Sequence, residues 1–203
     1  FSCPFGRNAF FLLYENDAFS GTTLLTTPAP AVDGFGTAVG ISGNNALIGA
    51  PLANSGRGAV YYYVYDPGNF DFSLPTAISL PPALPPNARF GSKLIVNQDI
   101  ALISSTNGTG SVHVYKLISG IWVFQTTLSG TTNVDKFGGA LSLFDQGGGS
   151  FLTMIGAIGA NSFGSAYLFR GNNNQWKPIC RADAPVSITQ FGTCVAVYGN
   201  TAI

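Results

Sequence analysis

The dipeptide Phe-Gly recurs at a nearly constant distance, and this spacing constrains the fold more than any other feature of the sequence. The four copies begin at Phe35, Phe90, Phe137 and Phe191, which are 55, 47 and 54 residues apart. A repeat of about 50 residues is typical of one four-stranded blade of a β-propeller. The sequence is therefore expected to fold as an array of similar small sheets.

The residues after each Phe-Gly predict the strands of one blade. Apolar residues stand four and six positions after each Phe: Val39 and Ile41, Leu94 and Val96, Leu141 and Leu143, Val195 and Val197. This alternation marks a strand with one buried face. A polar turn, a second strand such as "ALIGAP" and a third such as "GAVYYYVYD" follow, and an aromatic residue leads into the fourth. The third repeat inserts "DQGGGS" into its first turn. With almost no helical signal, the chain is predicted to be all-β.

Composition excludes several classes of protein. Hydrophobic residues make up 46% of the 203 residues and charged residues only 9%, so intrinsic disorder is not expected. Nine basic residues are balanced by nine acidic ones, which leaves no basic patch for nucleic acid. No apolar run is long enough to predict membrane insertion. The first residue is Phe rather than Met, and we expect a processed or partial chain.

The two ends of the sequence are predicted to be complementary parts of one repeat. Pro51 lies sixteen residues after Phe35, and counting sixteen from Phe191 through Ile203 to Phe1 ends at Pro4. We expect one array over 1–203, with repeats at 33–82, 88–130 and 135–183, and a split repeat that starts at 189–203 and ends at 1–30. Three interpretations stay open: a window of a longer array, a closed four-bladed ring, or a subunit whose ends complete a blade with its neighbours.

These motifs resemble a known family. The Phe-Gly start, the "IGAP" at residues 48–51 and the "GAVYYYV" third strand are similar to FG-GAP repeats, the blades of integrin-α-like β-propellers. The resemblance implies four antiparallel strands in each blade, blades around a channel, and adhesion or ligand binding on one face. It implies no reaction, since such modules also accompany catalytic domains. Residues 104–106 ("SST") and 156–160 ("GAIGA") depart from the "GAP" pattern.

The calcium loop of the family has no counterpart in this sequence. The turns between strands 1 and 2 carry at most one carboxylate each, whereas calcium prefers six to eight oxygen ligands. We therefore predict no metal there, and no cofactor. His113, the only histidine, lies in "GSVHVYKL" and is interpreted as a partly buried strand residue rather than a general base. No nucleophile elbow or phosphate-binding loop is present, so no catalytic residue and no enzyme activity are predicted. A paired-carboxylate hydrolase at the propeller mouth is an alternative.

Cysteines and one sequon favour an extracellular or cell-surface location. Cys3, Cys180 and Cys194 allow a Cys180–Cys194 or a Cys3–Cys194 disulfide, and buried free thiols are the alternative. Asn107-Gly108-Thr109 is a candidate glycosylation site.

If the loop geometry of the family holds, the 2–3 and 4–1 connections share one face. These loops are residues 52–57, 105–110, 159–163, 26–33, 80–89, 130–136 and 182–189, and they are rich in Asn, Ser, Thr and Pro. They suit protein or carbohydrate partners. Trp122 and Trp176 could stack against sugars, but their matching register favours a structural role in each blade.

The predicted function is a non-enzymatic structural or adhesive scaffold, including assembly into a larger structure or filament through blade completion. The specific binding residues are not predicted. A discrete carbohydrate- or protein-binding, lectin-like module is the alternative, followed by an accessory domain of a larger secreted enzyme.

Overall fold

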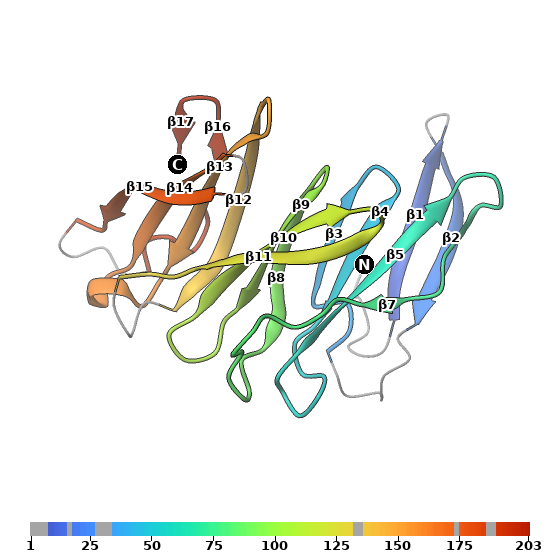
Figure 1. Ribbon diagram of the computed structural model, residues 1–203, viewed down its shortest axis with the longest axis horizontal. Coiled ribbons are helices and arrows are strands. Elements are labelled where there is room, and N and C mark those ends of the chain that lie inside the picture. The colour runs from blue at the N-terminus through green and yellow to red at the C-terminus, as the bar shows by residue number, and fades with distance from the viewer. Residues whose placement is uncertain (1–7, 16–17, 27–33, 132–135, 173–174, 186–189) are drawn as a thin grey trace.

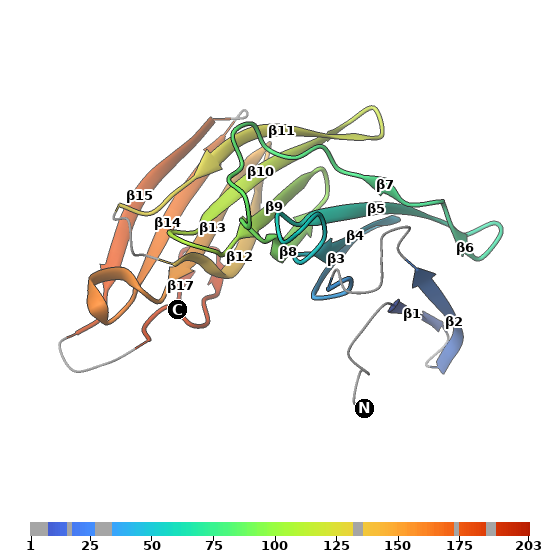
Figure 2. The ribbon, with the colours of Figure 1, turned by 90° about the horizontal axis from the view of Figure 1, so that it is seen from below.

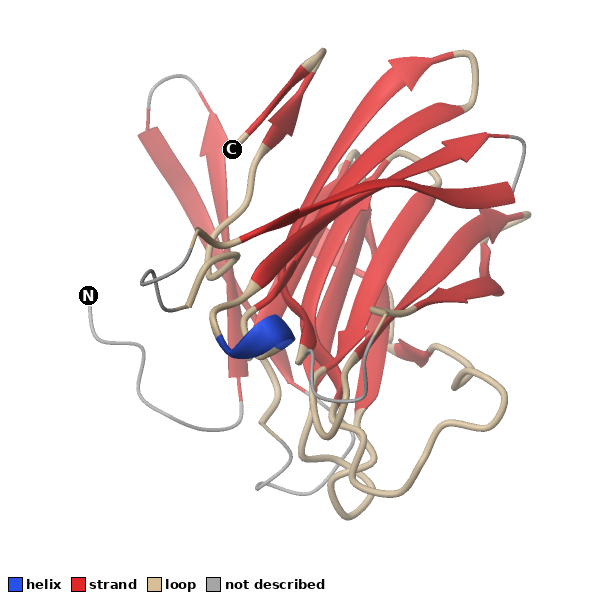
Figure 3. Ribbon diagram, turned by 90° about the vertical axis from the view of Figure 1, so that its left-hand side faces the viewer, coloured by secondary structure: helices blue, strands red, loops and turns tan. Residues whose placement is uncertain are grey.

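The computed structural model describes residues 8–15, 18–26, 34–131, 136–172, 175–185 and 190–203. Within these residues the chain forms strands, turns and one short 3-10 helix, η1 (Ala160–Ser162), which Figure 3 shows beside the sheets. The strand pairs are antiparallel, and most are joined by tight turns. The predicted all-β array of antiparallel blades is confirmed.

Three blades follow one another along the chain, as Figure 1 shows. Blade 1 contains β3 (Ala38–Ser42), β4 (Asn45–Ala50) and β5 (Ala59–Asp66), with its outer position shared by the short strands β6 (Asp71–Phe72) and β7 (Thr76–Ala77). Blade 2 contains β8 (Phe90–Asn97), β9 (Ile100–Ser105), β10 (Ser111–Ile118) and β11 (Ile121–Leu128). Blade 3 contains β12 (Phe137–Gly147), β13 (Ser150–Ala157), β14 (Ser165–Asn172) and β15 (Gln175–Asp183).

A two-stranded hairpin flanks the blades at each end of the array. The first hairpin is β1 (Asn8–Glu15) with β2 (Ala18–Thr26), and the last is β16 (Val197–Tyr198) with β17 (Thr201–Ala202). In Figure 2 the blades form an open arc, with β1 and β2 next to blade 1 and β17 next to blade 3. The two hairpins are separate sheets. The repeat boundaries, and the split repeat in particular, stay a prediction.

The Phe-Gly dipeptides connect neighbouring blades. Phe90, Phe137 and Phe191 each form a parallel bridge to the glycine that precedes strand 3 of the preceding blade, namely Gly58, Gly110 and Gly164. These glycines have φ values of 94°, 77° and 100°, which glycine adopts most readily, and a Cβ there would collide with the carbonyl oxygen of the bridged Phe. The Phe of each Phe-Gly and the glycine before strand 3 of the preceding blade thus form the backbone bridge that joins two neighbouring blades.

Inside their own blades, Phe35, Phe90 and Phe137 pack against strand 3. Phe137 is fully buried, and its ring lies 5.3 Å from that of Tyr167 and 6.0 Å from that of Phe169. In blade 1, Phe35 makes the corresponding contacts with Tyr61 and Tyr63. The rings of Phe90 and Phe137 contribute to apolar clusters that neighbouring blades share, one between blades 1 and 2 and one between blades 2 and 3.

Candidate functional site

The described 2–3 loops and 4–1 linkers lie at one edge of the array, because the strands of each blade alternate in direction. The loop before β5 and the linker before β8 both lie along the lower edge in Figure 1. Residues 27–33, 132–135 and 186–189 of the predicted loop set lie outside the described residues.

A pocket of about 510 Å³ lies among these loops, and we call it the loop-edge pocket. It is lined by Asn54, Ser55, Arg57, Leu84, Pro86 and Asn87. Leu84 is buried and belongs to the apolar cluster shared by blades 1 and 2, whereas the other five residues are exposed. The pocket therefore offers an apolar contact surrounded by amide, hydroxyl and guanidinium groups.

Hydrogen bonds fix the shape of the loop-edge pocket. The guanidinium Nη2 of Arg57 donates to the carbonyl oxygen of Leu84 at 3.2 Å. The side-chain amide of Asn107 donates to the carbonyl oxygen of Asn87 at 2.7 Å, which ties the blade 2 loop to the linker. Asn54 has a φ of 53°, a left-handed conformation that Asn tolerates better than most residues. These contacts hold the blade 1 loop, the linker and the blade 2 loop in one arrangement.

His113 lies on β10 in the register that Tyr61 and Tyr167 occupy in the other blades, three residues after the bridging glycine. Its side chain is 3% exposed. Nε2 lies 3.0 Å from Oγ of Ser105, and Nδ1 lies 3.0 Å from Oγ1 of Thr127. Burial lowers the pKa of the imidazole from 6.5 to about 4, so the ring is neutral at pH 7. The geometry assigns His113 to the core of blade 2.

The candidate modification residues differ in their surroundings. Asn107 is exposed, although its amide nitrogen is held by Asn87. Cys180 and Cys194 are both exposed free thiols, and Cys3 lies outside the described residues. The predicted disulfides and glycosylation therefore stay predictions.

The carboxylates of Asp183 and Asp66 accept hydrogen bonds from nearby protein groups. Asp183 accepts hydrogen bonds from Ser165 Oγ and Arg181 Nε, and these contacts lower its pKa, with that from Ser165 the larger cause. The side-chain amide of Asn69 and the backbone N–H of Gly68 lower the pKa of Asp66 in the same way. Across the described residues, no group of three His, Cys, Asp or Glu side chains is arranged to hold a metal ion. None of the described helices is long and apolar enough to cross a membrane.

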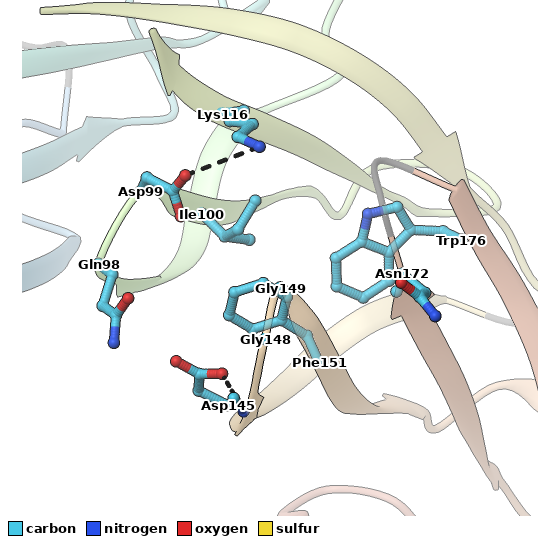
Figure 4. A pocket seen from close by; sticks show the side chains of 12 residues that line it. Gln98, Asp99, Ile100, Lys116, Asp145, Gly148, Gly149, Phe151, Asn172 and Trp176 are labelled. Atoms are coloured by element: carbon cyan, nitrogen blue, oxygen red, sulfur yellow. Dashed lines mark hydrogen bonds and ion pairs between the residues drawn. The ribbon is translucent and has the colours of Figure 1, made fainter.

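A second pocket, which the sequence reasoning missed, lies at the opposite edge of the array. This interblade pocket, of about 400 Å³, opens between blades 2 and 3 at the β8–β9 and β12–β13 turns and the adjoining ends of β14 and β15. Figure 4 shows Ile100, Phe151 and Trp176 around its centre, with Asp99 and Lys116 on one side and Asp145 on another. The glycine-rich "DQGGGS" insertion forms part of its wall, and Trp176, whose possible stacking against sugars the sequence suggests, lines it as well.

Antiparallel blades in one register, joined by Phe-Gly bridges, define a propeller-like repeat protein. Residues 23–65, which extend from β2 to β5, match the family model described as FG-GAP repeat. The predicted resemblance to FG-GAP repeats is thus confirmed for this part of the chain. A search of curated proteins found no match. FG-GAP repeats are typical of propeller-like adhesion or binding modules, which are typically extracellular and non-enzymatic.

Proposed function

We propose that the chain is a non-enzymatic extracellular scaffold whose loop edge binds a protein partner in adhesion. The observation that carries this proposal is the loop-edge pocket, which the blade 1 loop and the following linker form in advance of binding. A pre-formed site loses less conformational entropy on binding than a loop that must first be ordered.

The chemistry of the loop-edge pocket favours an extended peptide segment with little charge. Asn54, Ser55 and Asn87 provide neutral donors and acceptors, and Arg57 is its one charged lining residue. Backbone amides of a peptide could pair with these groups while an apolar side chain covers Leu84. The whole chain has no net formal charge, so long-range electrostatic attraction is not expected to dominate.

Selection of displayed random peptides on the immobilised chain tests this proposal. Enriched peptides should bind saturably, and binding should weaken at least tenfold in Asn87→Gly. Glycine is the informative replacement because Asn87 has a φ of 56°, which glycine adopts without strain.

The matched control is Lys93→Ala, an exposed charged residue of β8 that does not line the loop-edge pocket. Its peptide affinity should equal that of the unaltered chain. Failure to enrich any peptide, or peptides whose binding is equally strong in Asn87→Gly, would contradict protein binding at this edge.

A further inference from the structure

The two tryptophans occupy the same register in neighbouring blades but differ in their surroundings. Trp122 pairs with Leu117 across β11 and β10, and Trp176 pairs with Gly171 across β15 and β14. Trp122 is 3% exposed and packs edge-on against Tyr62 in the core. Trp176 is only partly buried and lines the interblade pocket. A purely structural role therefore accounts for Trp122 but not for the exposure of Trp176.

Gly171 allows the indole of Trp176 to lie across the sheet. A Cβ on Gly171 would lie 2.7 Å from two atoms of the indole ring, closer than side-chain atoms ordinarily approach. Across Gly171 the indole reaches Phe151, with the ring centroids 6.5 Å apart and the planes 21° apart. Phe151 and Ile100 are 6% and 5% exposed, so both are firmly packed. The interblade pocket thus has a broad aromatic and aliphatic surface, and the buried side chains of Phe151 and Ile100 hold it in place.

Polar groups surround this apolar surface. Asp145 accepts a hydrogen bond from the backbone N–H of Gly147 at 2.7 Å, which leaves its second carboxylate oxygen without a protein donor in the described part of the chain. The side-chain amides of Gln98 and Asn172 likewise make no hydrogen bond to any described residue. Each can both donate and accept, whereas a carboxylate only accepts. The rim therefore matches hydroxyl groups, which also do both.

The charges at the rim disfavour an anionic ligand. Asp99 lies 3.8 Å from Nζ of Lys116, so this pair presents little net charge, and Asp145 would repel an anion. A cation would pair with Asp145 alone, whereas a neutral ligand with several hydroxyl groups can use Asp145, Asn172 and Gln98 together. A ligand with an apolar face, several hydroxyl groups and no charge suits this combination best.

The geometry points to a neutral saccharide as the ligand of the interblade pocket. The C–H face of one sugar ring covers the indole of Trp176, and its hydroxyl groups bond to Asp145, Asn172 and Gln98. Concave sites with an apolar lining and a few placed polar groups are the usual form of small-molecule pockets. This site lies at the opposite edge from the loop-edge pocket and does not depend on protein binding there.

Tryptophan fluorescence tests the proposal. Trp122→Phe leaves Trp176 as the one tryptophan of the chain, so its emission reports on the interblade pocket. Glucose, galactose, mannose and N-acetylglucosamine, which differ in hydroxyl orientation or substitution, are titrated separately, with choline chloride as the cationic probe. At least one sugar should change the emission saturably, and calorimetry on the unaltered chain should give the same Kd.

Two variants and one control locate the site. Trp176→Ala and Gly171→Ala should each weaken sugar binding, measured by calorimetry, at least tenfold, the second because the new methyl group displaces the indole. Gly171 does not have a positive φ, so alanine there is not expected to prevent folding. Asn87→Gly should leave sugar binding unchanged, and Trp176→Ala should leave peptide binding unchanged. Absence of saturation with all four sugars, equal affinity in both pocket variants, or binding of choline instead would overturn the proposal.

Discussion

Burial of His113 is expected to make the folded protein less stable as the pH falls from 7 to 5. In the described structure the imidazole contacts uncharged groups: the hydroxyls of Ser105, Ser111 and Thr127 and the rings of Phe90 and Phe124. Among the described residues, no carboxylate is close enough to offset the cost of a buried imidazolium. Burial accordingly lowers the pKa of His113 from 6.5 to about 4 in the folded protein.

The direction and the size of this change in the free energy of unfolding follow from proton uptake at His113. Below pH 6.5 the unfolded chain binds a proton at His113, whereas the folded protein does so only near pH 4. The stabilisation is therefore complete above pH 6.5 and is lost as the pH falls towards 4. Between pH 7 and pH 5 the free energy of unfolding should decrease by about 2 kcal/mol. His113 is the only histidine, and the lowered pKa values of Asp66 and Asp183 place their titration below this range.

Urea unfolding at pH 7, 6 and 5 measures this loss. His113→Gln keeps a neutral hydrogen-bonding side chain at the position, so its free energy of unfolding should change little over the same range. The proton NMR signal of the single imidazole provides a second measurement that needs no variant, and it should not titrate near pH 6.5. Equal pH dependence in both proteins, or an imidazole that titrates near pH 6.5, would refute the reasoning.

Three further predictions follow from the packing. Gly110→Ala should destabilise the protein by at least about 2 kcal/mol more than Gly120→Ala in urea unfolding. Both glycines have positive φ, but only a Cβ on Gly110 would collide with Phe137, so equal losses would contradict the bridge between blades. Phe137→Ala should cost about 3–5 kcal/mol in the same assay, and a loss below about 1 kcal/mol would contradict its packing. Exposed Cys180 and Cys194 should react with Ellman's reagent in the native protein, and an unchanged signal in Cys180→Ser would contradict a free thiol there.

The strand arrangement of each blade could be predicted from the sequence, because the residues that determine it are close together in the chain and recur in each repeat. Phe-Gly recurs about every 50 residues, and a ring pair stands three and five residues after the glycine before strand 3, as Tyr167 and Phe169 do after Gly164. Each of these features corresponds to a contact in the structure. His113 takes the place of a tyrosine in this arrangement, which explains why a lone histidine carries no catalytic signal. The fold class follows from these residues alone.

The interblade pocket could not be predicted in the same way, because it depends on differences between repeats. Trp122 and Trp176 have the same register, and only Gly171 in place of Leu117 allows the second indole to lie across the sheet. The sequence predicts "DQGGGS" to lie in the turn between the first two strands of its repeat, and the β12–β13 hairpin confirms this. Its position beside the turn of the neighbouring blade is a long-range contact that no local pattern encodes.

Strand 1 shows most directly that a blade is completed by its neighbour. Val39 and Ile41 on β3 have the same alternation as Leu94 and Val96 on β8, yet they are 52% and 48% exposed, whereas Val96 is 8% exposed. The side chains of Leu94 and Val96 on β8 face β3 of blade 1. The two strands are so close that a Cβ added to Gly40 on β3 would touch both side chains. The period of two therefore predicts which face of strand 1 is apolar, while the preceding blade determines whether that face is buried.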